Sequence, residues 1–194
     1  MVVVTTLPFG RPLTVDDLDV LPDDGHRYEL LDGSLLVTPA PAWGHQAVAK
    51  NVTLLLDENC PPDLRVVPAP FEWRIRSDTA LQPDVLVARF ADLDAAPGRK
   101  HLLAPPLLVV EVQSPSTRRI DRMTKLAAYD DEGVAAYWIV EPDPDRPSIE
   151  VFERTEASRL MAAGSAVGDA VLHCTVPFAV DIQPSALVAD LRQR

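Results

Sequence analysis

Residues 107–129, LLVVEVQSPSTRRIDRMTKLAAY, constrain the fold most strongly, because an apolar strand is followed directly by an amphipathic helix. The run LLVVEV has the β-branched composition of a central strand. Apolar residues at helical spacing then predict a helix over 118–133, which Gly133 ends, with Ser116 or Thr117 as its cap. A strand of this kind must pack against other layers, so the stretch predicts an α/β or α+β fold.

The rest of the chain alternates strand-like and helix-like segments. Asp32-Gly33 lies between two apolar runs and predicts a β-hairpin over 27–39, because glycine accepts positive φ. Apolar residues at helical spacing predict a helix over 42–60. Other expected elements are a short helix within 14–25 that starts with a Thr14/Asp17 capping box, strands at 64–75, 83–90, 135–142 and 148–154, and a last helix at 185–193. This order predicts one domain over 1–194, with a central mixed sheet flanked by helices and an N-terminal hairpin.

Composition and charge restrict the function classes. The net charge of −11 argues against a broad electrostatic grip on nucleic acid, so a polyanion must be bound locally. Cys60 and Cys174 stand alone, which favours neither a zinc site nor a disulfide. No apolar run is long enough to span a membrane, and the start of the chain lacks the pattern of a secretory signal, so we expect a cytoplasmic protein.

Two carboxylates stand out because they adjoin apolar strands, Asp84 in QPDVLV and Glu111 in VVEVQS. Burying an ionised carboxylate without a partner is costly, and two neighbouring carboxylates repel unless a cation lies between them. Magnesium prefers oxygen ligands and usually takes one or two protein carboxylates. Asp84 and Glu111 are therefore the candidate metal ligands, and we expect Mg²⁺ or Mn²⁺ as the cofactor.

The residues around Glu111 are the next candidates. Side chains alternate along a strand, so Gln113 should lie beside the metal, and the backbone carbonyl of Val112 is a further possible ligand. Asp121, Lys125 and Tyr129 are four residues apart and share a helix face, from which Lys125 can reach the same cavity. The structural alternative for Lys125 is an ordinary ion pair with Asp121 on an exposed helix.

Several blocks together resemble a known family. In chain order they are RYELLDG, the His45-Gln46 pair, QPDVLV, VVEVQSPSTRRID, KLAAY at 125–129, GVAAYWIVEP and SIEVF. As a set they are similar to the bacterial "putative restriction endonucleases", formerly a domain of unknown function, within the PD-(D/E)XK nuclease superfamily. This resemblance spans most of the chain.

The resemblance implies a restriction-endonuclease-like core and a metal-dependent endonuclease acting on DNA. Asp84 and Glu111 would be the metal carboxylates, Glu29 a possible third acid, and His45 an accessory residue. The superfamily pattern places Lys two residues after the second acid, where this chain has Gln113. Glutamine can orient a water but carries no positive charge, so we expect Lys125 to supply that charge.

The resemblance also suggests a substrate path and an assembly. Arg118, Arg119 and Arg122 are candidates to meet the phosphates that flank the cut, as a local positive rim on an acidic body. Enzymes that cut both strands are commonly symmetric dimers, so a homodimer is expected by analogy.

Two other function classes stay open on the sequence alone. A nuclease-fold protein that binds nucleic acid or a protein partner with weak or no cutting is favoured by Gln113 and by the acidity of the chain. A small-molecule or scaffold role on the same sheet is the third. Retained acids in an apolar pocket favour the enzyme, because a binder has no use for them.

Overall fold

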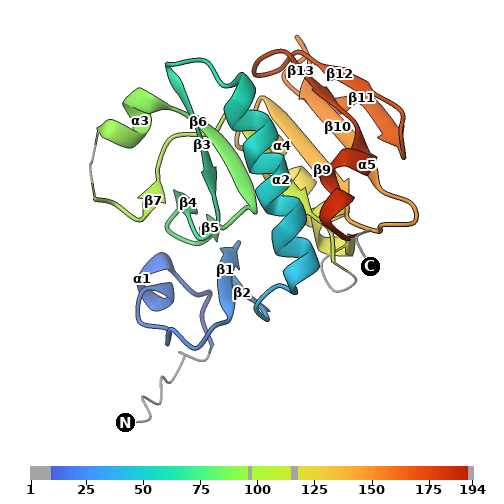
Figure 1. Ribbon diagram of the computed structural model, residues 1–194. Coiled ribbons are helices and arrows are strands. Elements are labelled where there is room, and N and C mark those ends of the chain that lie inside the picture. The colour runs from blue at the N-terminus through green and yellow to red at the C-terminus, as the bar shows by residue number, and fades with distance from the viewer. Residues whose placement is uncertain (1–9, 96–97, 115–117, 192–194) are drawn as a thin grey trace.

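The computed structural model describes residues 10–95, 98–114 and 118–191. Within these ranges the central element is a six-stranded mixed sheet (Figure 1). Its strands are, in spatial order, β11 (Leu160–Val167), β10 (Ser148–Arg154), β9 (Ala136–Glu141), β8 (Leu108–Val112), β6 (Val85–Arg89) and β3 (Leu64–Pro68). The central pair β8 and β9 runs parallel, and the other neighbours are antiparallel.

A second, five-stranded sheet was not anticipated from the sequence. Its strands are, in spatial order, β2 (Ser34–Thr38), β1 (Arg27–Leu31), β5 (Thr79–Leu81), β4 (Glu72–Arg76) and β7 (His101–Leu102). β1 and β2 are the predicted hairpin, with Asp32 and Gly33 at positive φ in the turn. A two-stranded sheet of β12 (Leu172–Cys174) and β13 (Val180–Ile182) completes the strands of the described ranges.

The prediction of a single strand over 64–75 is wrong. The segment divides into β3 and β4, which belong to different sheets. Pro68 and Pro70 lie where the division occurs, and proline has no backbone N–H to donate to a strand ladder. The break also separates the layers, because β3 extends the six-stranded sheet while β4 pairs with β5 and β7 in the five-stranded sheet.

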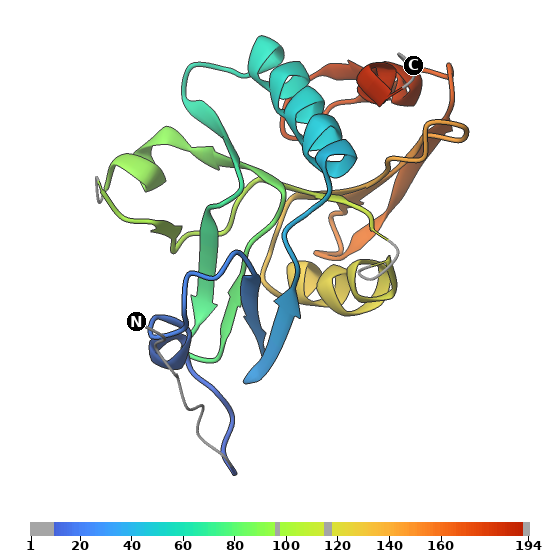
Figure 2. The same ribbon diagram turned by 60° about the horizontal axis from the view of Figure 1, so that its bottom comes forward.

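Both faces of the six-stranded sheet are covered. Helix α2 (Trp43–Asn59) packs Val48, Val52 and Leu56 onto one face. The other face packs against the five-stranded sheet and against the helical segment that follows β8. Figure 2 shows α2 and this segment on opposite sides of the sheet. The predicted α/β class, with a central mixed sheet flanked by helices, is confirmed.

The helical segment after β8 begins as a π-helical turn, η1 (Ile120–Lys125), and continues as α4 (Leu126–Asp131). The N–H of Leu126 donates to the carbonyl of Asp121, five residues earlier. The predicted helix over 118–133 is therefore confirmed with a wider first turn. Its expected caps, Ser116 and Thr117, lie outside the described residues.

The remaining helices are short. They are α1 (Val15–Leu18), α3 (Phe90–Asp94), α5 (Pro184–Leu187) and the 3₁₀ turn η2 (Ala189–Leu191). The predicted capping box is present in α1, where Asp17 accepts the N–H of Thr14. The last predicted helix is interrupted at Val188 and becomes the α5 and η2 turns. Across the described ranges, each helix is too short or too polar to cross a lipid bilayer.

Candidate active site

The register of β6 and β8 places Asp84 opposite Glu111. Val85 pairs with Val110 in this antiparallel ladder, so extending it by one residue brings Asp84 level with Glu111. Directly opposed residues of an antiparallel pair project their side chains to the same face. Asp84 is 3% and Glu111 is 2% exposed, and both line one cavity of about 340 Å³. The structure therefore brings these two acids together.

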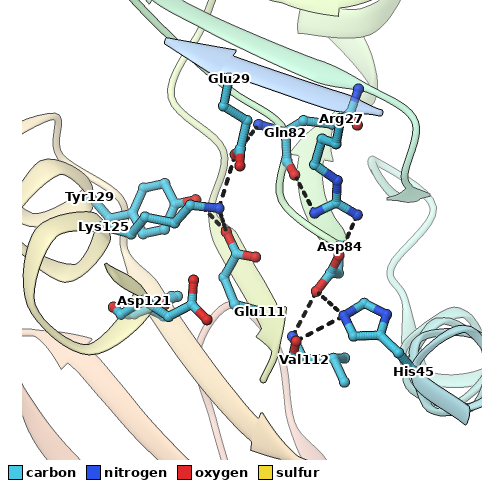
Figure 3. Close-up of polar contacts among 11 residues, drawn as sticks. Arg27, Glu29, His45, Gln82, Asp84, Glu111, Val112, Asp121, Lys125 and Tyr129 are labelled. Carbon is cyan, nitrogen blue, oxygen red and sulfur yellow. Dashed lines mark hydrogen bonds and ion pairs between the residues drawn. The ribbon is translucent and has the colours of Figure 1, made fainter. Parts of the chain in front are cut away.

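Asp84 is held by partners from three elements (Figure 3). The guanidinium of Arg27 in β1 donates to Oδ1 at 2.7 Å. The backbone N–H of Val112 donates to Oδ2 at 2.8 Å, and Nε2 of His45 in α2 lies 3.1 Å from the same oxygen. Burial alone would raise the pKa of Asp84, but the His45 hydrogen bond and the charge of Arg27 lower it to about 2. Asp84 is therefore an ionised carboxylate near neutral pH.

Glu111 is held by two side chains of the helical segment. The ammonium of Lys125 and the hydroxyl of Tyr129 donate to Oε1 of Glu111, at 2.9 and 2.7 Å. Among the described residues, the hydrogen bonds of this carboxylate go to Oε1, and Figure 3 shows Oε2 turned toward Asp84. One oxygen is thus fixed by the protein while the other faces the second acid.

Lys125 joins Glu111 to Glu29. Its ammonium donates to Oε1 of Glu29 at 2.9 Å, and the N–H of Gln82 donates to the same oxygen. Lys125 is 3% exposed, which excludes the alternative that it forms an ordinary ion pair with Asp121 on an exposed helix. Burial opposes its charge, but the carboxylates around it raise the pKa of Lys125 above the ordinary value. The ammonium is therefore the favoured form of Lys125 at physiological pH.

A fourth acid, Asp121, faces the same cavity from the π-helical turn. It is 1% exposed and lines the cavity with Glu29, Asp84 and Glu111. Burial raises the pKa of Glu111 to about 8, and the three neighbouring carboxylates act in the same direction against the ammonium of Lys125. The site thus concentrates negative charge around Glu111. π-helical turns are frequent at functional sites, and this one carries both Asp121 and Lys125.

The other residues predicted near the metal line the cavity with different contacts. Nε2 of His45 lies 2.9 Å from the carbonyl of Val112, so this carbonyl already has one partner. Gln113 is 2% exposed, and its amide is bound by the helical segment: Nε2 donates to the carbonyl of Arg118, and Oε1 accepts from Arg122. Gln113 therefore contacts the helical segment as well as the cavity.

The three arginines predicted as a phosphate rim do not line this cavity. Arg118 forms an ion pair with Glu141. Arg122 binds Glu150 through both guanidinium nitrogens, at 2.8 and 2.6 Å. Arg119 is exposed at the start of the helical segment. At least two of the three are thus engaged with acids of the same chain.

Arg27, Tyr129 and Asp121 were not assigned to the site from the sequence. Tyr129 and Asp121 share the helix face of Lys125, and that spacing was a signal for both. Tyr129 also packs against Trp73 and Tyr137, and burial together with Glu111 raises the pKa of its hydroxyl well above the ordinary value. Arg27 gave no such signal, because its contact with Asp84 joins positions 57 residues apart.

The donor set fits a hard divalent cation. Four buried carboxylates line the cavity, and the lysine and arginine side chains in the lining are Lys125 and Arg27. Negative charge is therefore in excess, which a cation would balance. Within the described ranges, no group of three or more His, Cys, Asp or Glu side chains is arranged so that it could hold a metal ion, so water or substrate oxygens would have to complete the shell around one or two carboxylates. Magnesium suits such a site, because it needs one or two protein carboxylates and completes its shell with water or phosphate oxygens.

Comparisons with known proteins identify the family of the chain and a solved structure with a similar fold. Residues 15–179 match the Uma2 family, described as "Putative restriction endonuclease". The fold is similar to a crystal structure described as "a putative nuclease belonging to DUF820" from Anabaena variabilis, with a TM-score of 0.71 and 18% sequence identity. The similarity covers 92% of this chain and 98% of that one, and it shows a shared fold. A search of curated proteins found no match. The family match spans most of the chain, which therefore belongs to the Uma2 family of restriction-endonuclease-like proteins.

Proposed function

We propose that the chain is a metal-dependent endonuclease that hydrolyses phosphodiester bonds of DNA, with Asp84 and Glu111 as its metal ligands. The observation that carries the proposal is the pair of opposed, buried carboxylates at one cavity, with the ammonium of Lys125 on one of them. When bound there, Mg²⁺ or Mn²⁺ would lower the pKa of a bound water toward neutrality and neutralise charge on the phosphate. Family membership supports nuclease activity in general.

Asp84 and Glu111 are prepared for this role by different neighbours. Arg27 and His45 keep Asp84 ionised and fix its orientation. Lys125 and Tyr129 hold Oε1 of Glu111, which leaves Oε2 to face the cavity. Ligands held by packed neighbours lose little freedom when a cation binds, and such neighbours commonly tune metal affinity.

Lys125 supplies the positive charge that the superfamily pattern places at the position of Gln113. Its raised pKa keeps the ammonium protonated, so its role is electrostatic stabilisation of the developing charge rather than proton abstraction. Glu29 holds the ammonium from the other side, and it remains a candidate ligand for a second metal. We assign Gln113 to orienting the attacking water from the cavity lining.

The proposal is tested by plasmid cleavage in Mg²⁺ or Mn²⁺. Wild-type protein should nick supercoiled plasmid, and Asp84→Asn and Glu111→Gln should abolish nicking while circular dichroism shows an unchanged fold. Glu150→Gln is the matched control, because it removes an acid of the same sheet that lies outside the cavity. Equal cleavage by all four proteins would reject the assignment and indicate a contaminating nuclease.

The second candidate is a nuclease-fold protein that binds nucleic acid without cutting. The observation that favours it is Gln113, which leaves β8 without the usual lysine. Binding of a labelled duplex by wild-type protein, with no nicking in either metal, would support this candidate over the enzyme. For the active protein we propose a homodimer, which light scattering in solution would test.

A further inference from the structure

A second cavity lies against the candidate active site. It has a volume of about 200 Å³ and shares three wall residues with the first cavity: Arg27, His45 and Asp84. The rest of its wall comes mainly from α2, including Gln46, Lys50 and Thr53, and from the end of β3. The shared side chains, which Figure 3 shows around Asp84, therefore separate two neighbouring spaces.

The two cavities differ in charge. The first has four carboxylates in its lining against Lys125 and Arg27. The second has one carboxylate, Asp84, against Arg27 and Lys50, and its other polar side chains are neutral or histidine. A divalent cation suits the first space, and an anion suits the second.

We propose that the second cavity is a phosphate-binding subsite, in which Arg27 and Lys50 hold the phosphate next to the one that is cut. The inference rests on the proposed function, because the active site defines which phosphate is cut. A nucleic-acid strand is a row of regularly spaced anions, so a cation-binding space beside an anion-binding space fits two successive parts of one strand. A strand whose scissile phosphate lies in the first cavity would place a neighbouring phosphate on the far side of Asp84.

Arg27 can bind phosphate without releasing Asp84. Its guanidinium has five N–H donors in a planar fork. It donates from Nη2 to Asp84 at 2.7 Å and from Nη1 to the carbonyl of Gln82 at 3.1 Å. Arg27 is partly exposed, at 15% of its side chain, and it contributes to the lining of both cavities. The guanidinium is thus a fixed donor between the metal ligand and the second space.

Lys50 is free to take a phosphate at small cost. Its ammonium lies 3.0 Å from Asp190, and the two side chains are 59% and 44% exposed. An exposed ion pair of this kind contributes little to stability and is screened by salt. Lys50 can therefore exchange Asp190 for a phosphate oxygen.

Salt dependence of DNA binding tests the subsite directly. The logarithm of duplex affinity falls with the logarithm of salt concentration, with a slope of about −0.9 for each phosphate contact. We would measure fluorescence anisotropy of a labelled 20-base-pair duplex in Ca²⁺, from 50 to 200 mM salt, with a gel to verify that the DNA stays uncut. Lys50→Ala should make the slope about 0.9 less steep, so that wild type loses about 3.5-fold more affinity than the variant over this range.

Further variants separate the subsite from other cationic surfaces. Arg27→Ala should make the salt slope less steep, as Lys50→Ala does. Arg27→Lys should keep the wild-type slope, because the positive charge stays. Arg89→Ala is the matched control, since Arg89 forms an exposed ion pair with Asp92 and lies outside both cavities, and its slope should equal that of wild type. Lys50 is exposed, so its variant is informative even if Arg27→Ala does not fold.

The outcomes distinguish the two proposals. A salt slope in Lys50→Ala equal to that of wild type, or a less steep slope in Arg89→Ala alone, would overturn the subsite even when plasmid cleavage is normal. If Lys50→Ala has a less steep salt slope but wild-type protein does not cleave plasmid, the nuclease function is rejected and the anion-binding site is retained.

Discussion

The ammonium of Lys125 donates a hydrogen bond of 2.9 Å to Oε1 of Glu111, from fourteen residues further along the chain. The superfamily pattern places its lysine two residues after the acid, on the same strand. Here the charge comes from the helical segment that follows β8, and it is buried with Glu111 and Glu29. The ammonium that contacts Glu111 thus comes from the helical segment and not from β8 itself.

Lys125→Met tests whether this ammonium is catalytic. Methionine keeps most of the stem and removes the charge, so we expect cleavage to fall about 100-fold or more and duplex affinity to change by less than about threefold, because one buried cation contributes little to phosphate contact. Loss of the charge also leaves buried carboxylates with fewer partners, which should cost about 3–5 kcal/mol of unfolding free energy. Single-turnover cleavage and urea unfolding measure both effects. An unchanged cleavage rate in the folded variant would leave Lys125 a structural role.

His45→Ala tests how Asp84 is positioned. Nε2 of His45 lies within hydrogen-bond distance of Oδ2 of Asp84 and of the Val112 carbonyl. Removing such a neighbour of a metal ligand typically lowers metal affinity by about 10- to 100-fold. Calorimetric titration with Mn²⁺ measures this loss, and His173→Ala, which removes an exposed histidine paired with Asp181, is the control. Equal Mn²⁺ affinity in both variants would contradict the assigned role.

Metal binding should release a proton near neutral pH. Burial raises the pKa of Glu111 to about 8, so below that pH the carboxyl group of the metal-free protein carries a proton that the cation must displace. The apparent affinity for Mn²⁺ should therefore rise with pH until about pH 8 and then level off. Calorimetry at pH 6.5 in buffers of different ionisation enthalpy counts the proton, and Glu111→Gln should show no release. An affinity independent of pH between 6 and 8 would contradict Glu111 as a ligand.

Asp84 should make the protein sensitive to acid. Its pKa is lowered from 3.8 to about 2 in the folded chain, which corresponds to about 2 kcal/mol of stability. Because the folded pKa is the lower one, this contribution is complete well above pH 3.8 and is lost as the pH falls toward 2. By pH 3 about 1 kcal/mol of it should be gone. Urea unfolding from pH 5.5 to 3 should show this loss in wild type and a shallower loss in Asp84→Asn. Identical pH slopes in the two proteins would be inconsistent with the Arg27 and His45 contacts.

Much of the fold was predictable from local patterns. The hairpin at Asp32-Gly33, the helix over 42–60 and the strand pair at 135–142 and 148–154 are present, because turn chemistry and side-chain period determine each of them locally. The division of 64–75 between two sheets was not predictable in this way. It depends on which distant strands β3 and β4 pair with, and sequence spacing contains no such information.

In the candidate site too, local sequence patterns indicated some residues and could not indicate others. Asp84 and Glu111 stood out because a carboxylate beside an apolar strand is costly, and Lys125 followed from helical spacing. Arg27 was missed because its contact with Asp84 depends on how the five-stranded sheet lies against the six-stranded one. The pairing of Arg118 and Arg122 with Glu141 and Glu150 was missed because it depends on how the helical segment after β8 lies against β9 and β10.

A crystal structure of the wild-type protein grown in Mn²⁺, with anomalous data, would show whether Asp84 and Glu111 bind a metal together. We expect an anomalous peak between the carboxylates of Asp84 and Glu111, with the ammonium of Lys125 still bound to Glu111. A well-ordered cavity without such a peak at saturating Mn²⁺, or a metal bound elsewhere on the chain, would contradict the assignment of Asp84 and Glu111 as metal ligands.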